Sequence, residues 1–217
     1  MATKTSRMIE YPRADGRPMA ETDVHRDLMF DLIETLQDRF ENERMVYVSG
    51  NLLVFYQEGN RRKHVAPDVF VVRGVEKRQR ENYLIWEEGK SLDAVIELTS
   101  KSTKEEDVDD KYRLYSKELR VPEYFLFDPH GDYLHPPLRG FRLRGDEYFP
   151  IRSIAGRLPS RVLGLHLERD GTQLRLYDPQ TRRRLITPRE FNKEARAEIA
   201  RLRRELNARQ RNGSRKS

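Results

Sequence analysis

The chain of 217 residues is long enough for one substantial hydrophobic core and does not require a second domain. Hydrophobic residues make up 36% of it and charged residues another 36%, so the sequence predicts a compact core under a very polar surface. It contains no cysteine, which excludes disulfide bonds, zinc–thiolate sites and cysteine nucleophiles.

The net charge of +6 is distributed unevenly along the chain. Residues 181–217 hold thirteen Lys or Arg and four Glu, a net +9, which leaves −3 on residues 1–180. Overall basicity is therefore weak evidence that the folded body binds phosphates. The apolar runs are too short to cross a bilayer, and no apolar stretch follows the N-terminal positive charges. We therefore expect no membrane segment, no secretory signal and a cytoplasmic location.

The N-terminal part of the chain predicts a polar lead followed by an amphipathic helix. Residues 1–18 are polar and rich in turn-forming residues, so we expect a flexible lead. The helix is expected from Asp23 to Glu41, with Thr22 as its N-cap. Its apolar stripe has helical spacing and consists of Val24, Leu28, Met29, Leu32, Ile33, Leu36 and Phe40.

A set of strands follows the helix. Short β-type runs are expected at 45–49, 52–56 and 67–72, and Gly50-Asn51 predicts a hairpin turn between the first two. Residues 73–91 are charged and irregular and predict a long irregular connection between strands. The order strand 92–98, helix 104–119 and strand 123–127 then predicts a crossover unit with two neighbouring parallel strands. A capping box, Thr103 to Glu106, marks the start of that helix.

The C-terminal part of the chain predicts further hairpins and a last helix. The hairpin strands are expected at 141–143, 147–151, 163–167 and 174–177. Thr187-Pro-Arg-Glu190 is a second capping box with proline at the first helical position. The helix that it opens has an apolar stripe able to pair two subunits: Phe191, Ala195, Ile199, Leu202 and Leu206. We therefore predict a lead at 1–18, one folded domain at 19–186, and an amphipathic helix with a basic disordered tail at 187–217.

Two acidic residues stand beside strands that are otherwise apolar. Asp68 precedes Val-Phe-Val-Val, and Glu97 closes the run Ala-Val-Ile-Glu-Leu. A buried acid costs free energy unless it is paired or binds a metal, which favours a functional site. The alternative is that each acid merely ends its strand at solvent.

Lys111 lies inside the apolar stripe of the helix at 104–119. Its neighbours at spacings of three and four are Val108, Tyr112, Tyr115 and Leu119, so its side chain starts from the face that packs on the sheet. One reading is that the ammonium points at Asp68 and Glu97, since Glu97 ends the strand that enters this helix. The other is that it extends along the surface to water.

Two carboxylates and a lysine suffice for metal-dependent hydrolysis of a phosphodiester. Carboxylates are hard ligands that hold Mg²⁺ or Mn²⁺ and leave positions for water and phosphate. The metal polarises the phosphoryl oxygen and acidifies the attacking water. A nearby ammonium orients that water or stabilises the charge that develops on phosphorus.

Four ordered motifs carry a resemblance to a known family. They are Val-Ala-Pro-Asp68-Val-Phe-Val-Val, Ala-Val-Ile-Glu97-Leu-Thr, Asp-Asp-Lys111-Tyr-Arg-Leu-Tyr115 and Val-Pro-Glu-Tyr-Phe-Leu-Phe-Asp128-Pro. In these the chain resembles the Uma2 family of restriction-endonuclease-like proteins, within the PD-(D/E)XK nuclease superfamily. The resemblance implies an α/β fold with a mixed β-sheet flanked by helices, here with extra β-hairpins and a C-terminal helix.

The resemblance also implies an activity and its residues. Asp68 and Glu97 would bind Mg²⁺ or Mn²⁺ and Lys111 would be the catalytic lysine of an endonuclease that cleaves DNA, with no organic cofactor. The usual superfamily lysine stands two positions after the second acid, where this chain has Thr99. The family places it on the following helix instead, at Lys111.

Two further residues are candidates for auxiliary roles. His25, at the edge of the first helical stripe, can serve as a ligand or base, although a histidine in such a place is more often a packing residue. Tyr115 lies one turn after Lys111 and either supports it or belongs to the core.

Three hypotheses follow. The first is a Mg²⁺- or Mn²⁺-dependent DNA endonuclease that forms a homodimer. The second is a non-catalytic DNA- or partner-binding module on the same fold, and the third is an interaction protein that acts through its C-terminal helix. The complete set of Asp68, Glu97 and Lys111 favours the first, because a degenerate copy would more readily have lost one of them.

Overall fold

The computed structural model describes residues 11–12, 22–99 and 110–213. The chain divides into two compact units, Met1–Leu185 and Ile186–Ser217. Most of the expected lead at 1–18 and the capping box at 103–106 lie outside the described residues.

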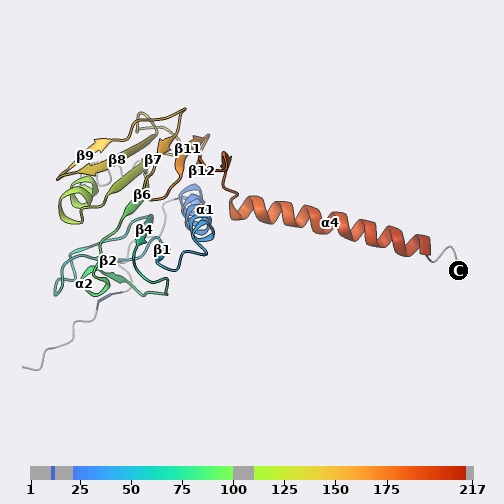
Figure 1. The fold of residues 1–217 in the computed structure, drawn as a ribbon, viewed down its shortest axis with the longest axis horizontal. Helices are drawn as coiled ribbons and strands as arrows, with labels where there is room; N and C mark the ends of the chain where they lie inside the picture. The colour runs from blue at the N-terminus through green and yellow to red at the C-terminus, as the bar shows by residue number, and fades with distance from the viewer. Residues whose placement is uncertain (1–10, 13–21, 100–109, 214–217) are drawn as a thin grey trace, which may run out of the picture. The chain divides into compact units, whose positions relative to one another are not determined.

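A six-stranded mixed sheet forms the centre of the first unit (Figure 1). In spatial order its strands are β1 (Val46–Ser49), β4 (Val69–Arg73), β6 (Ala94–Leu98), β7 (Glu123–Phe127), β8 (Leu138–Arg144) and β9 (Glu147–Pro150). Strands β6 and β7 are parallel, and every other neighbouring pair is antiparallel. Both are buried along their whole length, as expected for parallel strands covered on both faces.

The connection from β6 to β7 includes a short helix that ends in a π-helical turn. The described part of the expected helix consists of α3 (Lys111–Arg113) and the π-helical turn η2 (Leu114–Glu118). Because β6 and β7 run parallel, the predicted crossover unit is confirmed.

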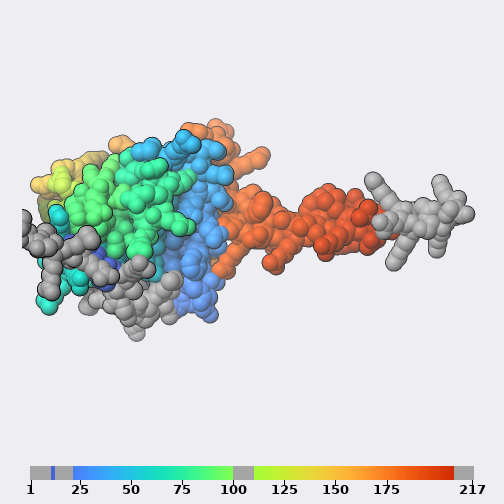
Figure 2. Space-filling model, turned by 90° about the horizontal axis from the view of Figure 1, so that it is seen from below, coloured from blue at the N-terminus to red at the C-terminus, as the bar shows by residue number. Residues whose placement is uncertain are grey.

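Helix α1 (Asp23–Arg39) covers one face of the sheet (Figure 1). It begins as predicted, since the Thr22 hydroxyl accepts the backbone N–H of His25 at 3.1 Å. Its buried stripe packs on the alternate strand residues that face it, which include Val69, Val71 and Ile96. In Figure 2 the blue surface of α1 adjoins the green surface of the chain between β4 and β6.

The opposite face of the sheet packs against η2 and the small strands. The intervening strand residues, among them Phe70, Val95 and Tyr124, form a second cluster with Tyr115 and Leu119. Side chains alternate along a strand, so Glu97 shares the face of Val95 and lies on the side of η2.

The predicted hairpin at Gly50-Asn51 is wrong. Strand β1 pairs with β4, whereas β2 (Val54–Phe55) pairs with β3 (His64–Val65) and, in parallel, with β5 (Tyr83–Leu84). The connection at 73–91, which was predicted to be irregular, thus contains β5 and also α2 (Ile85–Glu88).

The Gly50-Asn51 pair packs against the chain before β4 instead of forming a tight turn. The Asn51 N–H donates to the carbonyl of Pro67 at 2.8 Å. A Cβ on Gly50 would lie 2.0 Å from the Asp68 carbonyl oxygen, so only glycine allows this approach.

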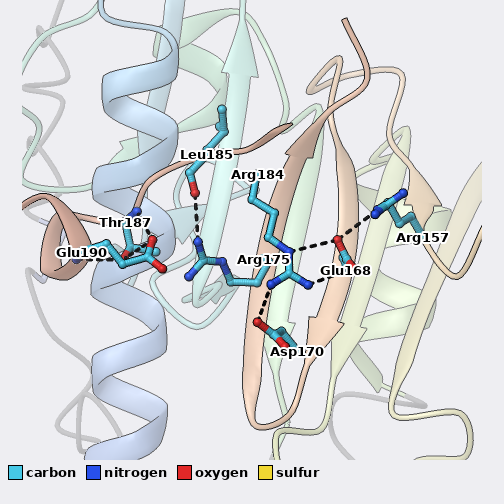
Figure 3. Close-up of polar contacts among 8 residues, drawn as sticks. All are labelled: Arg157, Glu168, Asp170, Arg175, Arg184, Leu185, Thr187 and Glu190. Atoms are coloured by element: carbon cyan, nitrogen blue, oxygen red, sulfur yellow. Dashed lines mark hydrogen bonds and ion pairs between the residues drawn. The ribbon is translucent and has the colours of Figure 1, made fainter. Parts of the chain in front are cut away.

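A four-stranded antiparallel sheet completes the first unit. Its strands are β10 (Leu158–Pro159), β11 (His166–Asp170), β12 (Gln173–Asp178) and β13 (Arg183–Arg184). The predicted hairpins are present as β8/β9 and β11/β12, although β11 begins three residues later than the strand predicted at 163–167. Figure 3 shows Glu168 between Arg184 and Arg157, each 3.0 Å away. The hydrogen bond from Arg184 has the largest effect and lowers the pKa of Glu168, and the hydrogen bond from Arg157 lowers it further. Partial burial acts in the opposite direction but does not outweigh them.

The second unit contains α4 (Pro188–Gly213). Its predicted capping box is confirmed, because the Glu190 carboxylate accepts the Thr187 N–H at 2.9 Å (Figure 3). The Thr187 hydroxyl accepts the Glu190 N–H at 3.3 Å. Among the described residues, no helix is both long and apolar enough to cross a membrane.

Candidate active site

Asp68 and Glu97 meet because their strands are antiparallel neighbours. Asp68 directly precedes β4 and Glu97 lies in β6, where Val69 pairs with Ile96. The backbone N–H of Asp68 donates to Glu97 Oε2 at 3.2 Å, and the N–H of Leu98 donates to Asp68 Oδ2 at 2.8 Å. The Glu97 carboxylate is therefore held by a backbone N–H at the start of β4, and the Asp68 carboxylate by a backbone N–H of β6.

Lys111 and Tyr115 reach the same carboxylate from the crossover. The Lys111 ammonium lies 3.2 Å from Glu97 Oε1, and the Tyr115 hydroxyl donates to that oxygen at 2.6 Å. The Glu97 side chain is fully buried, whereas the Lys111 side chain is 15% exposed. The ammonium thus lies against Glu97 instead of extending along the surface.

His25 joins the site from the first turn of α1. Its Nε2 lies 3.0 Å from Asp68 Oδ1, and both side chains are mostly buried. The Thr22 cap fixes the start of the helix that carries it. The structure therefore brings together all five residues singled out in the sequence: Asp68, Glu97, Lys111, His25 and Tyr115.

Thr99 and Tyr133 form a second polar contact two residues beyond Glu97. The Thr99 hydroxyl donates to the Tyr133 hydroxyl at 3.0 Å, and Thr99 is buried. A threonine thus occupies the usual position of the superfamily lysine and pairs with a tyrosine. Tyr133 comes from the loop between β7 and β8 and was not among the candidates predicted from the sequence.

Asp128 organises the loop that carries Tyr133. Its carboxylate accepts the backbone N–H groups of His130, Gly131, Tyr133 and Leu134 at 2.8–3.2 Å. Burial raises the pKa of Asp128, but these four donors lower it by more, so its pKa lies below the ordinary value. The signal for this loop was present in the sequence as Asp-Pro-His-Gly, an Asx-type turn after a strand.

The Asp68 carboxylate leaves room for a hard divalent cation, whereas the Glu97 side chain is fully buried and both of its oxygens already have described contacts. The Asp68 side chain is 15% exposed, and each of its oxygens has a single described contact, so a cation can reach the remaining lone pairs. Among the described residues, no group of three or more His, Cys, Asp or Glu side chains is arranged to hold a metal ion. Mg²⁺, however, is commonly bound by one or two carboxylates, with water and substrate phosphates completing its coordination. Asp68 is the carboxylate open to that mode of binding, and Glu97 lies next to it.

Comparisons with known proteins agree with this architecture. The profile of the Uma2 family, described as "Putative restriction endonuclease", matches residues 1–170. Among solved structures, the fold is similar to the crystal structure of "a putative nuclease belonging to DUF820" from Anabaena variabilis. The two chains are 15% identical with a TM-score of 0.50, and the match covers 68% of this chain and 79% of the other. No curated protein matches the chain.

Proposed function

Because the chain belongs to the Uma2 family and has a restriction-endonuclease-like fold, we propose that it is a metal-dependent endonuclease that hydrolyses DNA phosphodiester bonds. The observation that carries this proposal is the convergence of Asp68, Glu97 and Lys111 at one point of the sheet. Asp68 and Glu97 would hold Mg²⁺ or Mn²⁺, and DNA would be the substrate.

Within this proposal Asp68 and Glu97 supply the negative charge that holds the cation. When bound, a divalent cation polarises a phosphoryl oxygen and acidifies a water molecule. The backbone N–H groups of Asp68 and Leu98 orient the two carboxylates before substrate arrives. Such fixed orientation lowers the reorganisation needed during the reaction.

Lys111 is the catalytic lysine in this proposal. Its ammonium is held 3.2 Å from Glu97 but retains some exposure, so it can also contact a water molecule or a phosphate. There it would orient the attacking water or stabilise the charge that develops on phosphorus. Tyr115 and His25 act as positioning residues, because they contact Glu97 and Asp68 respectively.

Cleavage of supercoiled plasmid DNA in the presence of Mg²⁺ or Mn²⁺ tests the proposal. We expect the wild type to nick the plasmid, and Asp68→Ala and Lys111→Ala each to lower the rate by roughly 10²-fold or more. Lys117→Ala is a matched control, because it removes an exposed lysine of η2 and should leave the rate unchanged. Circular dichroism and thermal unfolding would establish that each variant is folded.

Two outcomes would overturn the nuclease assignment. One is a wild type that cuts no DNA with either metal, and the other is equal cleavage by wild type and both site variants. Retention of DNA binding without cleavage would then support the non-catalytic binding module.

A further inference from the structure

Helix α4 presents an exposed apolar face. Of the nine large hydrophobic side chains that are exposed among the described residues, four belong to this helix. They are Phe191 (63% exposed), Ile199 (50%), Leu202 (51%) and Leu206 (57%). Exposure of this kind along one element marks a surface for association.

The apolar residues of α4 follow the spacing of a coiled coil. Ile199 and Leu206 are seven residues apart and occupy a positions, while Ala195 and Leu202, also seven apart, occupy d positions. Asn192 falls at the preceding a position. An isoleucine at a with a leucine at d favours two parallel strands, and a single asparagine at a fixes register and oligomeric state.

Charged residues beside this seam favour one orientation of the partner. Glu198 and Glu205 occupy g positions, and Arg196 and Arg203 occupy e positions. In a parallel pair a g residue faces the e residue five positions later on the other helix, so Glu198 would face Arg203. In an antiparallel pair g faces g and e faces e, which places like charges together.

Within α4 the two g-position glutamates are also paired with an arginine of the same helix. Arg201, at a c position, contacts Glu198 at 2.6 Å and Glu205 at 3.8 Å within α4. These contacts preorganise the helix without covering its apolar face.

We propose that α4 pairs with α4 of a second copy of this chain as a parallel, in-register, two-stranded coiled coil. The seam from Asn192 to Leu206 spans about two heptads, so the association is concentration-dependent. It does not depend on the nuclease activity, since the evidence for it lies entirely within α4.

The mass of the full-length protein in solution is the first test. The chain has a mass of 25.8 kDa, and we expect light scattering to give twice this value at high protein concentration and a lower average on dilution. Leu202→Lys should shift the protein to the monomer mass. Ala197→Lys adds the same charge at an f position on the opposite side of the helix and should leave the dimer intact. A monomeric wild type at all concentrations, or equal dissociation by both variants, would overturn the proposal.

Engineered disulfides test the orientation. The chain has no cysteine, so Ile199→Cys and Leu206→Cys each introduce a single thiol at an a position. In a parallel, in-register pair each residue meets its own copy, and both variants should cross-link on mild oxidation with diamide. Ala197→Cys should remain uncross-linked. An antiparallel pair would cross-link at one of the two a positions at most, so that result, or cross-linking of neither, contradicts the proposed arrangement.

Discussion

Glu97 and Glu123 are both buried glutamates on neighbouring parallel strands, but their surroundings differ. Glu97 is fully buried near the end of β6, and Glu123 is 1% exposed at the start of β7. Glu123 pairs in register with Ala94, three residues before Glu97. The two acids thus lie towards opposite ends of the same strand pair.

Glu123 joins separate parts of the fold. Arg142 donates to its Oε1 at 2.9 and 2.7 Å, from Nε and Nη2, and the N–H groups of Arg161 and Val162 also donate to the carboxylate. The Ser160 hydroxyl contributes a further hydrogen bond. These contacts link β7 to β8 and to the segment after β10, and none of them involves a second carboxylate.

Glu97 instead lies beside another acid. Its described contacts are Lys111, Tyr115 and the backbone N–H of Asp68, whose own carboxylate faces His25. Two neighbouring carboxylates concentrate negative charge at one place, whereas Glu123 is a single carboxylate matched by one arginine. Burial of an acid therefore does not by itself indicate a functional site, and the neighbouring second acid is the feature that favours one at Glu97.

Removal of the structural glutamate should have the largest effect on stability. Glu123→Ala leaves Arg142 without its carboxylate, and we expect the free energy of unfolding to fall by about 3–5 kcal/mol. Glu97→Ala should cost less, about 1–3 kcal/mol, because Lys111 can turn towards Asp68 and the crowding of the two acids is relieved. Urea unfolding of both variants measures the difference. A Glu97→Ala variant as unstable as Glu123→Ala would contradict the different roles assigned to the two glutamates.

Asp128 is a third buried acid, and its described contacts are all with backbone N–H donors. Its lowered pKa means that the stability it contributes is present above its ordinary pKa of 3.8 and is lost as pH falls through the lower folded value. Asp128→Asn should therefore lower the free energy of unfolding by about 1.5–3 kcal/mol at pH 7. The difference from wild type should shrink below pH ~4.

Urea unfolding across this pH range checks the prediction for Asp128. Asp132→Asn removes an exposed carboxylate from the same loop and serves as the control. A constant difference between Asp128→Asn and wild type at all pH values would contradict the assignment of this stability to the charged form.

Tyr115→Phe should have the smallest effect on stability but should affect cleavage. Loss of its hydrogen bond to Glu97 should cost about 0.5–1.5 kcal/mol. Under the proposed function the cleavage rate should fall about 10–100-fold, because Glu97 loses an orienting partner. Tyr148→Phe removes a comparable buried hydrogen bond, to the Val121 carbonyl, and should leave the rate unchanged. Equal rates for the two variants would assign Tyr115 to the core alone.

The sequence predicted the parts of the fold that rest on long periodic patterns. The stripe of α1, its Thr22 cap and the parallel pair β6/β7 are confirmed. The sequence left open where the two carboxylates and the lysine point and favoured packing roles for His25 and Tyr115. The structure brings all five residues together, and strand ends and a helical face limit where Asp68, Glu97 and Lys111 can point. Their catalytic roles remain predictions.

Other features could not be predicted because they depend on distant partners. Gly50-Asn51 has the composition of a hairpin turn but packs on the chain before β4, and the two-residue strands β2, β3 and β5 carry too little pattern to specify their pairing. Glu123 carries the same signal as Glu97, an acid beside an apolar run. Its partner Arg142 is 19 residues away in sequence, so only the fold distinguishes the two acids.

The close approach of Gly50 to Asp68 limits how this sequence can change in evolution. Any side chain at position 50 would collide with the Asp68 carbonyl and with Ile33, so a replacement would displace the acid even though Gly50 has no chemistry of its own. Under the proposed function, a homologous gene with intact acids and lysine but a larger residue here is expected to encode an inactive protein. Genome surveys that score only Asp68, Glu97 and Lys111 would count such proteins as active, and inspection of this one glycine would separate them.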